Sequence, residues 1–581
     1  MTVKTQNTSL SSNALAVLSR RYLKKDDHGS VVESPGEMFR RVANSVAQAE
    51  LLYNSHRDIR ATEEKFFSIL SNLEFLPNSP TLMNAGRPLQ QLAACFVLPI
   101  EDSLESIFDG VKNTALIHQS GGGTGFSFSK LRPKDDAVRT TSGTASGPVS
   151  FMRVFNMATE VIKQGGTRRG ANMGILRVDH PDILEFISSK VNNRELTNFN
   201  ISVAVTEEFM HSVEIDGALL LVNPHNRQVV KRLRAREVFD RIVKMAWQTG
   251  DPGVVFLDRI NRENPTPQLG EMESTNPCGE QPLLPYEPCN LGSINLNLMI
   301  KESNGHPDVD WEKINQTVRI GVNFLDDVID VSRYPLDEVD RMAKGNRKIG
   351  LGVMGFADML IRLGIPYDTE DAVRTGEGII KFVKEKGWSY SAELARKRGV
   401  FPNYAGSRYD RAGGPALRNA TVTTIAPTGT LSIIAGCSSG IEPLYAISFT
   451  RHILGDVVLP EINESFLETA KKRGFFSDSL FMQVLAGDSI QRMSEVPEDV
   501  KRLFVTAFDI APEWHVRMQA AFQRHTDNAV SKTINFPPTA TEEDVRKAFM
   551  LAYREGVKGI TIFRSGSRSE QVLTCADPLY C

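Results

Sequence analysis

The chain has 581 residues, of which 41% are hydrophobic and 24% charged, and its formal net charge is −3. This composition is ordinary for a globular protein with a large core, and it gives no overall basic field for binding a nucleic acid polymer. No apolar run approaches the roughly 18 residues of a membrane span. The N-terminus lacks a signal-peptide core, and six cysteines are too few for a secreted disulfide framework. We therefore expect a cytoplasmic protein that needs no membrane.

Residues 1–70 are expected to form a helical N-terminal region. The segment SNALAVLSRRYL has helical apolar spacing, and the next helix opens at Ser34-Pro35, a cap followed by a proline at the first helical position. We treat residues 71–565 as one catalytic unit and residues 566–581 as a flexible tail that carries two cysteines.

Beyond residue 70, short β-branched or apolar runs alternate with helical stretches. This alternation favours an α/β fold with a buried, largely parallel sheet. The runs are LAACFVLPI, NFNISVAV, ALLLVN, GVVFLD, ATVTTIAPTG and KGITIF.

The segment NPCGE places Cys278 between an amide and a carboxylate. In an extended segment, residues two positions apart point the same way. Asn276, Cys278 and Glu280 would then face one small substrate together, although a turn with a buried cysteine fits the spacing equally well.

The remaining cysteines are Cys95, Cys289, Cys437, Cys575 and Cys581. They form no CxxC pair and have no histidine at zinc-ligand spacing, so we expect no metal site. Two distant thiols could meet in the fold and cycle as a dithiol and disulfide, and two more on a tail could recharge them by exchange. For Cys437, an ordinary core position is the favoured interpretation.

Three glycine-containing segments are candidates for contacts with a nucleotide. Pro427–Leu431 follows a β-branched run and could present backbone N–H groups to a phosphate, or form an ordinary capped turn. The stretch QGGTRRGAN combines glycines with Arg168 and Arg169, which suits a mobile loop that touches an anion or base. SGGGTGF is a second glycine-rich stretch, and neither is specific alone. The segment GLGVMG matches a dinucleotide fingerprint, but charged residues precede it, so we expect its glycines to serve close helix packing instead.

Together these motifs resemble a known family. NPCGE, the cysteine eleven residues later, LAACF, APTGTLS, SGGGTGF and QGGTRRGAN occur in the order found in the large catalytic chain of ribonucleotide reductase. The closing VKGITIFRSGSR resembles the coenzyme B12-dependent branch, class II. The resemblance covers roughly residues 12–573, and the set is highly specific although each motif alone is not.

The resemblance implies a ten-stranded α/β barrel, made of two antiparallel halves of five parallel strands, with a finger loop inside it that excludes water. Cys278 at the finger tip would carry a thiyl radical that takes the ribose 3′ hydrogen. Glu280 would act as general base on the 3′-hydroxyl, and Asn276 would hold the ribose hydroxyls. Cys95 and Cys289 would be the reducing pair and end as a disulfide.

The resemblance also implies further contacts. The substrate positions are Ser79, Ala94, Cys95, Gly123, Asn276, Pro427, Thr428, Gly429, Thr430 and Leu431. The positions for a specificity effector, a dNTP or ATP, are Asp102, Ser103, Arg132, Arg139 and Thr140. Cys575 and Cys581 would form a redox shuttle that meets thioredoxin or glutaredoxin. The substrates would be ribonucleoside diphosphates, and the chain would form a homodimer.

The radical source is expected to be adenosylcobalamin. A class I relay needs a tyrosine pair near Gly559–Phe563, and there is none. No glycyl-radical motif of class III is found either. Two alternatives remain: a class I large chain that needs a radical-generating subunit, and a catalytically inactive nucleotide-binding regulator.

Overall fold

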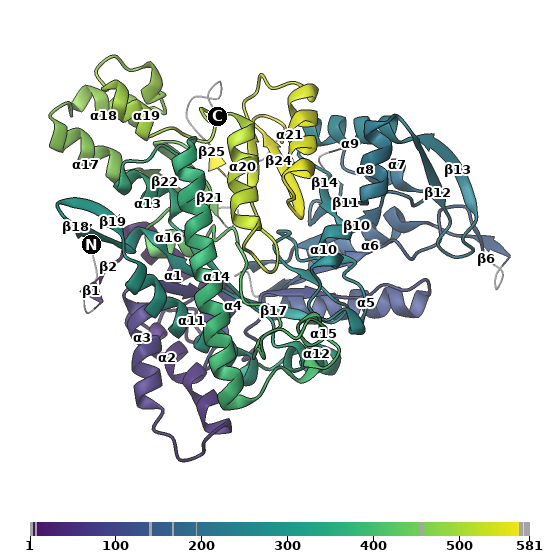
Figure 1. The fold of residues 1–581 in the computed structure, drawn as a ribbon, viewed down its shortest axis with the longest axis horizontal. Coiled ribbons are helices and arrows are strands. Elements are labelled where there is room, and N and C mark those ends of the chain that lie inside the picture. The colour runs from purple at the N-terminus through teal and green to yellow at the C-terminus, as the bar shows by residue number, and fades with distance from the viewer. Residues whose placement is uncertain are drawn as a thin grey trace.

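The computed structural model describes residues 4–5, 8–138, 142–164, 168–192, 195–453, 457–568 and 573–574. The N-terminal region is helical, as expected. Its helices are α1 (Ser12–Arg21), α2 (Pro35–Ala47) and α3 (Arg60–Ser71), at the lower left of Figure 1. The Ser34 hydroxyl accepts a hydrogen bond from Glu37 N at 3.3 Å, and the Glu37 side chain accepts one from Ser34 N at 2.7 Å. This capping box, with Pro35 in the first turn, explains why α2 begins there.

The first half of the barrel is a parallel sheet. Its strands follow one another in space in chain order, and each neighbouring pair is parallel. They are β4 (Cys95–Val97), β5 (Gly123–Ser127), β10 (Asn172–Arg177), β11 (Phe199–Val205) and β14 (Gly253–Phe256).

The second half is also parallel and closes the barrel. β17 (Pro288–Asn295) pairs with β20 (Ile349–Met354), and β23 (Thr533–Phe536) pairs with β24 (Gly559–Arg564). Between β20 and β23, residues 421–425 bridge both sides, through Leu351 with Thr423 and Ile425 with Val530.

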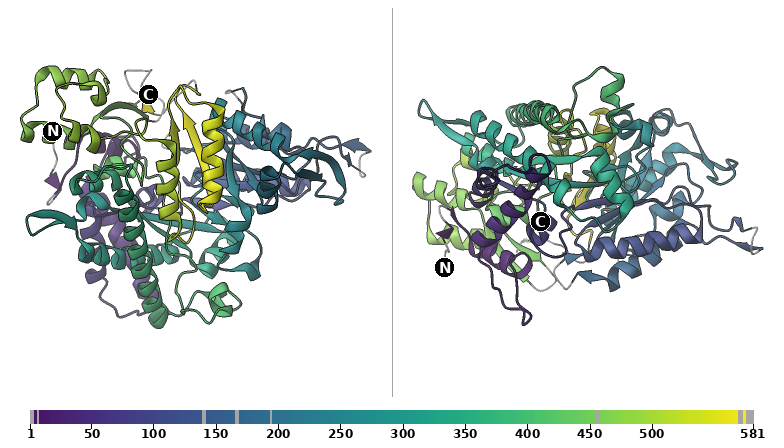
Figure 2. Two further views of the ribbon diagram at one scale, coloured as in Figure 1. Left: turned by 45° about the horizontal axis from the view of Figure 1, so that its top comes forward. Right: turned by 90° about the horizontal axis from the view of Figure 1, so that it is seen from below.

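The two halves meet in antiparallel fashion, β4 against β17 and β14 against β24. Counting residues 421–425 as a strand, the described part of the chain therefore forms a barrel of ten strands in two antiparallel halves of five. In Figure 2 the yellow C-terminal strands lie between the blue-teal first half and the green part of the second half. The predicted barrel is confirmed.

Helices cover the outside of each half. On the first half lie α5 (Leu104–Gln119), α6 (Pro148–Val161), α7 (Ile183–Ile187), α8 (Glu207–Glu214) and α9 (Ala235–Thr249). On the second half lie α11 (Trp311–Val331), α12 (Asp337–Asn346), α13 (Phe356–Leu363), α14 (Glu370–Arg398), α20 (Pro512–Gln523) and α21 (Glu542–Arg554). The short helix α10 (Leu257–Arg262) packs instead on the inner face of the first half. Two large apolar clusters lie under these helices, and one of them extends from the first half to β23, β24 and α21.

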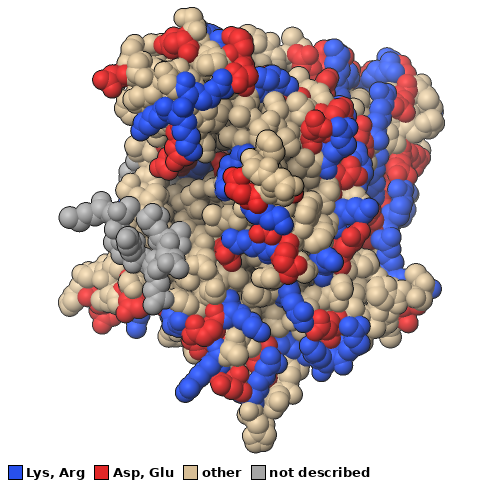
Figure 3. Space-filling model, turned by 60° about the vertical axis from the view of Figure 1, so that its left-hand side comes forward, with Lys and Arg blue, Asp and Glu red and all other residues tan. Residues whose placement is uncertain are grey.

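A smaller lobe lies above the barrel, at the upper left of Figure 1. It contains a hairpin of β21 (Ser448–Ile453) and β22 (Val457–Ile462), and the helices α17 (Glu464–Arg473), α18 (Asp478–Leu485) and α19 (Glu498–Leu503). On the face drawn in Figure 3, acidic and basic side chains are interspersed rather than gathered by sign. This face therefore offers no broad basic surface.

Two expectations about strands are wrong. ALLLVN forms β12 (Ala218–Val222), which pairs antiparallel with β13 (Val229–Arg234) in a hairpin outside the barrel. Its burial alternates along the strand instead of being continuous, so one face meets water. GLGVMG lies in the barrel strand β20, which α11 covers, but Gly350 and Gly352 make room for neighbouring strands and not for a helix. A Cβ on Gly352 would lie 2.2 Å from Thr424 O, so this glycine allows the next strand to approach.

Candidate active site

The finger is a short hairpin inside the barrel. β15 (Ser274–Thr275) pairs antiparallel with β16 (Pro282–Leu283) and contacts β4, β5 and β10. The Asn276 side-chain oxygen closes the tip by accepting a hydrogen bond from Gln281 N at 2.9 Å. Gly279 has a φ of +81°, which glycine adopts without steric cost.

The structure decides between the extended segment and the turn that the sequence leaves open. The segment from Asn276 to Glu280 is not extended, because Gly279 N donates to Asn276 O at 3.1 Å and turns the chain. As a result Asn276 and Glu280 are buried while Cys278 is exposed at the tip. The three side chains share one loop but differ in exposure.

Glycines of β5 make room for the finger. A Cβ on Gly125 would lie 1.7 Å from Thr275 O, and one on Gly123 would lie 3.0 Å from Pro277 Cγ. Neither position can carry a side chain without moving the hairpin. Gly123 therefore lies beside the finger tip, and its role as a substrate contact stays a prediction.

Both halves of the barrel hold the tip. Asn200 on β11 donates its side-chain N–H to Pro277 O at 2.8 Å. On the other side Glu280 O accepts hydrogen bonds from the Thr424 hydroxyl at 3.0 Å and from Ala529 N at 2.9 Å. Sequence analysis missed these residues, because none belongs to the motif that it positions.

Cys278 faces a cavity of about 1690 Å³ that runs from the finger tip to the upper lobe. Pro427, Cys437 and Thr561 also line it. Because the Cys278 side chain is exposed there, the barrel alone does not exclude water from the thiol. The expected exclusion therefore requires an occupant of the cavity.

Cys95 and Cys289, here called the cysteine pair, lie directly opposite each other on β4 and β17. Opposing residues of antiparallel strands have Cα atoms about 4.5–5.5 Å apart, which is within the range of about 4.4–6.8 Å that a disulfide spans. Both side chains are buried, and the Asn276 amide donates to Cys95 Sγ at 3.2 Å. Burial raises the pKa of the Cys289 thiol, so this sulfur holds its proton at neutral pH.

The predicted phosphate turn lies at the edge of the cavity. Pro427 lines the wall and precedes α16 (Leu431–Ala435), while Thr428 has a φ of +55°. Arg451 donates to Gly429 O at 3.1 Å, and Arg21 donates to the Thr430 hydroxyl at 3.2 Å. Two guanidinium groups thus contact the turn, although neither was singled out from the sequence.

Among the predicted substrate residues, Pro427 alone lines the cavity in the described part of the chain. The substrate residues outside the lining are Ser79, Ala94, Cys95, Gly123, Asn276, Thr428, Gly429, Thr430 and Leu431. Ser79 opens α4 (Ser79–Asn84), and its hydroxyl lies 2.7 Å from the Tyr22 hydroxyl. Ala94 packs with the cysteine pair.

Three of the predicted effector residues, Asp102, Ser103 and Arg132, lie near the start of α5. Asp102 accepts hydrogen bonds from Arg132 N at 3.1 Å and from Arg132 Nε at 2.8 Å. Ser103 caps the helix by accepting from Ser106 N at 3.1 Å. His225 Nδ1, on the loop of the β12–β13 hairpin, lies 3.7 Å from Asp102.

Several predicted residues cannot be placed. Arg139 and Thr140 of the effector loop, and the tail cysteines Cys575 and Cys581, lie outside the described residues. The same holds for part of QGGTRRGAN.

A buried cluster at the cavity wall was also missed. Lys532 Nζ lies 2.6 Å from Glu442 Oε2 and 3.1 Å from His515 Nδ1. Burial lowers the pKa of Lys532 and also that of His515. The three residues come from separate segments of the chain, so no local sequence pattern predicts the cluster.

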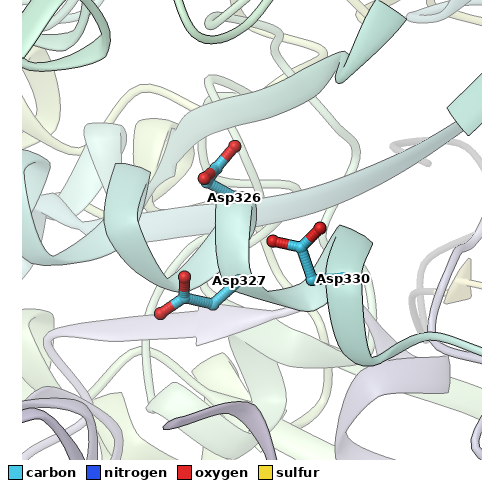
Figure 4. Close-up of side chains that lie close together, drawn as sticks. All are labelled: Asp326, Asp327 and Asp330. Carbon is cyan, nitrogen blue, oxygen red and sulfur yellow. The ribbon is translucent and has the colours of Figure 1, made fainter. Parts of the chain in front are cut away.

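Among the described residues, one carboxylate group has metal-like spacing: Asp326, Asp327 and Asp330 on α11 (Figure 4). Arginines already bind these carboxylates. The ion pairs are Asp326 with Arg347 at 2.9 Å, Arg398 at 2.9 Å and Arg418 at 3.4 Å, Asp327 with Arg398 at 2.6 Å, and Asp330 with Arg347 at 2.8 Å. These six residues, here called the carboxylate network, have the make-up of a buried ion-pair cluster.

Within the described residues, no helix is long and apolar enough to cross a membrane.

Comparisons with known proteins identify the family. The model "Ribonucleotide reductase, barrel domain" matches residues 93–563, and "Ribonucleotide reductase, all-alpha domain" matches residues 8–90. The chain belongs to the ribonucleotide reductase family. The sequence-based prediction of this family and its barrel is confirmed.

Two relatives narrow the likeness within the family. A vitamin B12-dependent ribonucleoside-diphosphate reductase of Thermoplasma acidophilum is 48% identical, over 97% of this chain and 80% of the relative. An enzyme of the same name from Mycobacterium tuberculosis is 51% identical, over 98% of this chain and 81% of the relative. Among solved structures, the Actinobacillus ureae class Id ribonucleotide reductase alpha subunit matches with a TM-score of 0.78 at 23% identity, over 96% of this chain and 97% of that one. This last likeness concerns the fold.

Proposed function

We propose that this chain reduces ribonucleoside diphosphates to 2′-deoxyribonucleotides by a thiyl-radical mechanism that depends on adenosylcobalamin. The observation that carries the proposal is the placement of Cys278 at a finger tip facing a large cavity, with the cysteine pair in register behind it. The names of the relatives at about half identity agree with the substrate and the cofactor.

The cavity suits the proposed cofactor. Its volume of about 1690 Å³ can hold a nucleotide and a large cofactor together. Tyr445, Asn463 and Thr561 line this cavity, and their hydroxyl and amide groups would be available to hydrogen-bond the amide side chains of the cofactor. When bound, adenosylcobalamin supplies the initial radical by homolysis of its cobalt–carbon bond.

The chain's own residues account for the remaining chemistry. Glu280 would take the 3′-hydroxyl proton, and the buried Asn276 amide would orient the hydroxyls beside Cys95. One thiol of the cysteine pair would give a proton to the 2′-hydroxyl, which leaves as water. The two sulfurs then close the disulfide and so supply the two electrons of the reduction.

The test is a ribonucleoside diphosphate reduction assay with dithiothreitol, with and without adenosylcobalamin. We expect deoxyribonucleotide product only when the cofactor is present. A class I large chain would give none under either condition but would gain activity from a radical-generating subunit. An inactive regulator would bind nucleotide and give no product in any mixture.

We also propose a homodimer whose interface includes α5 and α6. Exposed apolar side chains recur at helical spacing on both helices, which pack against each other: Leu104, Phe108 and Leu116 on α5, and Met157 and Val161 on α6. An apolar face of this kind on a globular protein marks an interaction site. Because Asp102 and Ser103 lie at the start of α5, a dNTP or ATP bound there would adjoin the interface. Light scattering should give a dimer for the parent and a monomer for Phe108→Asp, with the exposed Leu485→Asp on α18 as control.

Thioredoxin or glutaredoxin is the proposed final reductant, with Cys575 and Cys581 as the shuttle. β25 (Leu573–Thr574) pairs with β21, and Leu573 lines the cavity. The two described residues that immediately precede Cys575 therefore lie at the cavity. Replacing both tail cysteines with serine should preserve turnover with dithiothreitol and remove it with thioredoxin. Equal thioredoxin-driven rates in parent and variant would exclude the shuttle.

A further inference from the structure

Lys348 lies in line with the cysteine pair. Asn290 of β17 is opposite Ile349 of β20, so the preceding positions, Cys289 and Lys348, are neighbours as well. On its other side Cys289 is opposite Cys95. Cys289 Sγ lies 3.7 Å from Lys348 O, which agrees with this register. Lys348, Cys289 and Cys95 therefore form one row across adjacent strands.

The Lys348 ammonium group is held by a single carboxylate. Its Nζ lies 2.7 Å from Glu287 Oε2, and both side chains are fully buried. Glu287 also accepts hydrogen bonds from the Asn346 amide at 2.5 Å and from Leu284 N at 2.9 Å. Glu287 precedes Cys289 by two residues. The Lys348–Glu287 ion pair therefore links the chain that returns from the finger to the start of β20.

A buried ion pair is a costly way to join two strands, because an apolar pair of similar volume stabilises as well or better. Its position beside a thiol suggests what the charge does. The charged groups that act on Cys289 are Lys348, Glu287 and Glu280. Burial raises the pKa of Cys289 most, Lys348 opposes that rise, and the two carboxylates add to it.

We propose that Lys348, held by Glu287, is a positioning residue that stabilises the Cys289 thiolate when the Cys95–Cys289 disulfide is reopened. The inference rests on the proposed function, which requires that disulfide. A thiolate of an external dithiol attacks Cys95 Sγ, the bond between the two cysteine sulfurs breaks, and its electron pair goes to Cys289 Sγ. The second thiol of the dithiol then displaces Cys95, so the dithiol is oxidised by two electrons and both cysteines are reduced.

The geometry favours Cys289 over Cys95 as the leaving sulfur. Cys95 Sγ contacts the Asn276 amide of the finger, whereas Cys289 lies between Cys95 and Lys348. A leaving thiolate departs faster when its pKa is lower, and a neighbouring cation lowers it. In a dry interior no water can replace that cation.

The test measures reopening of the disulfide in the full-length enzyme. The protein is oxidised by one turnover without reductant, the Cys95–Cys289 link is confirmed by peptide mapping, and reduction by dithiothreitol is followed from pH 7 to 9. We expect Lys348→Met to slow reduction on the order of threefold to tenfold and to shift the disulfide potential to more negative values. Lys348→Arg should stay near the parent rate.

Glu287→Gln gives the sharper comparison. It leaves the lysine charge without its counter-ion, so reduction should become faster than in the parent, opposite to Lys348→Met. A merely structural ion pair would make both variants change in the same direction, and that result would overturn the inference. If Lys348→Met does not fold, Glu287→Gln decides alone, because slower or unchanged reduction contradicts the proposal.

The controls separate this inference from the proposed function. Lys344→Met removes an exposed lysine that pairs with Asp340 at 2.7 Å, and it should leave the reduction rate unchanged. Chemical oxidation with diamide forms the link independently of turnover. Absence of any Cys95–Cys289 link in the parent would contradict the proposed function, whereas a link whose reduction ignores both charge variants would contradict only the role of Lys348.

Discussion

Arg347 and Lys348 are adjacent in the chain, but they serve two buried polar regions of opposite design. Arg347 joins the carboxylate network on α11, where Asp326 alone has ion pairs with Arg347, Arg398 and Arg418. Lys348 forms one ion pair, with Glu287, and its backbone oxygen lies 3.7 Å from Cys289 Sγ. In the carboxylate network, several of the charged groups form more than one ion pair. Beside the cysteine pair a single cation faces groups whose charge changes during the proposed reaction.

Because of this difference, we expect substitutions in the carboxylate network to change the stability of the fold and substitutions at the cysteine pair to change its reactivity. Breaking a buried ion pair by removing one partner costs about 3–5 kcal/mol, because a charge is left uncompensated. Replacing a thiol of the cysteine pair with a hydroxyl alters reactivity while the fold can persist, because the two side chains are neutral and similar in size. The two regions should therefore respond to substitution in different measurements.

The largest effect is expected at Cys278. Cys278→Ser should abolish turnover, a loss of more than about a thousandfold, because a serine hydroxyl cannot form the required radical. Nucleotide binding, measured by calorimetry, should stay near the parent value since the side chain is small and exposed. Cys437→Ser is the matched control, a second thiol lining the same cavity. Appreciable repeated turnover in Cys278→Ser would exclude the finger-tip assignment.

The cysteine pair should show the next largest effect. Cys95→Ser or Cys289→Ser should block repeated turnover with dithiothreitol, since one thiol cannot close the disulfide. Product per enzyme in a rapid-quench assay should not exceed about one turnover. Mapping of a Cys437 link to either residue in the parent would show that the pairing is wrong.

The sequence predicted the reactive half of this comparison better than the stable half. NPCGE, the later cysteine and LAACF are local motifs, and strand register then brings Cys95 and Cys289 together. The sequence left an extended segment and a turn open for Asn276–Glu280, because both are compatible with the same residues. Lys348 and Glu287 are 61 positions apart and meet only through the pairing of β17 with β20.

The network was invisible for a similar reason. On α11 the acidic Asp326, Asp327 and Asp330 look like an exposed helix face in sequence. Their arginine partners stand at positions 347, 398 and 418, and the contacts exist only because α14 and the following segment pack against α11. Tertiary packing, and not local pattern, decides that these charges are buried.

The network should be tested by stability rather than activity. Arg398 has ion pairs with Glu50, Asp326 and Asp327. Arg398→Met should therefore lower the free energy of unfolding by about 3–5 kcal/mol, measured by urea titration. Activity per folded molecule should remain. Lys397→Met, the neighbouring and exposed lysine that pairs with Glu393, should change stability by less than about 1 kcal/mol. Equal effects of the two substitutions would contradict the assigned role of the network.

The smallest expected effect is on the stability of the fold in acid. It depends on the pKa of Asp326, which shifts in the opposite direction from that of Asp327. Burial by itself would raise its pKa, but Arg347, Arg418 and Arg398 outweigh burial and lower the pKa of Asp326 from 3.8 to about 2. A carboxyl group whose folded pKa is depressed stabilises the fold above its unfolded pKa, and that contribution is lost as the pH falls through the folded value. At about 1.4 kcal/mol per pKa unit, Asp326 should contribute about 2 kcal/mol that disappears between pH 4 and pH 2. Asp327 acts in the opposite sense, because burial raises its pKa.

Urea titrations across this range should show a weaker loss of stability in Asp326→Asn than in the parent or in the exposed Asp308→Asn control. An unchanged slope would mean that the arginines do not hold the Asp326 charge in the folded state.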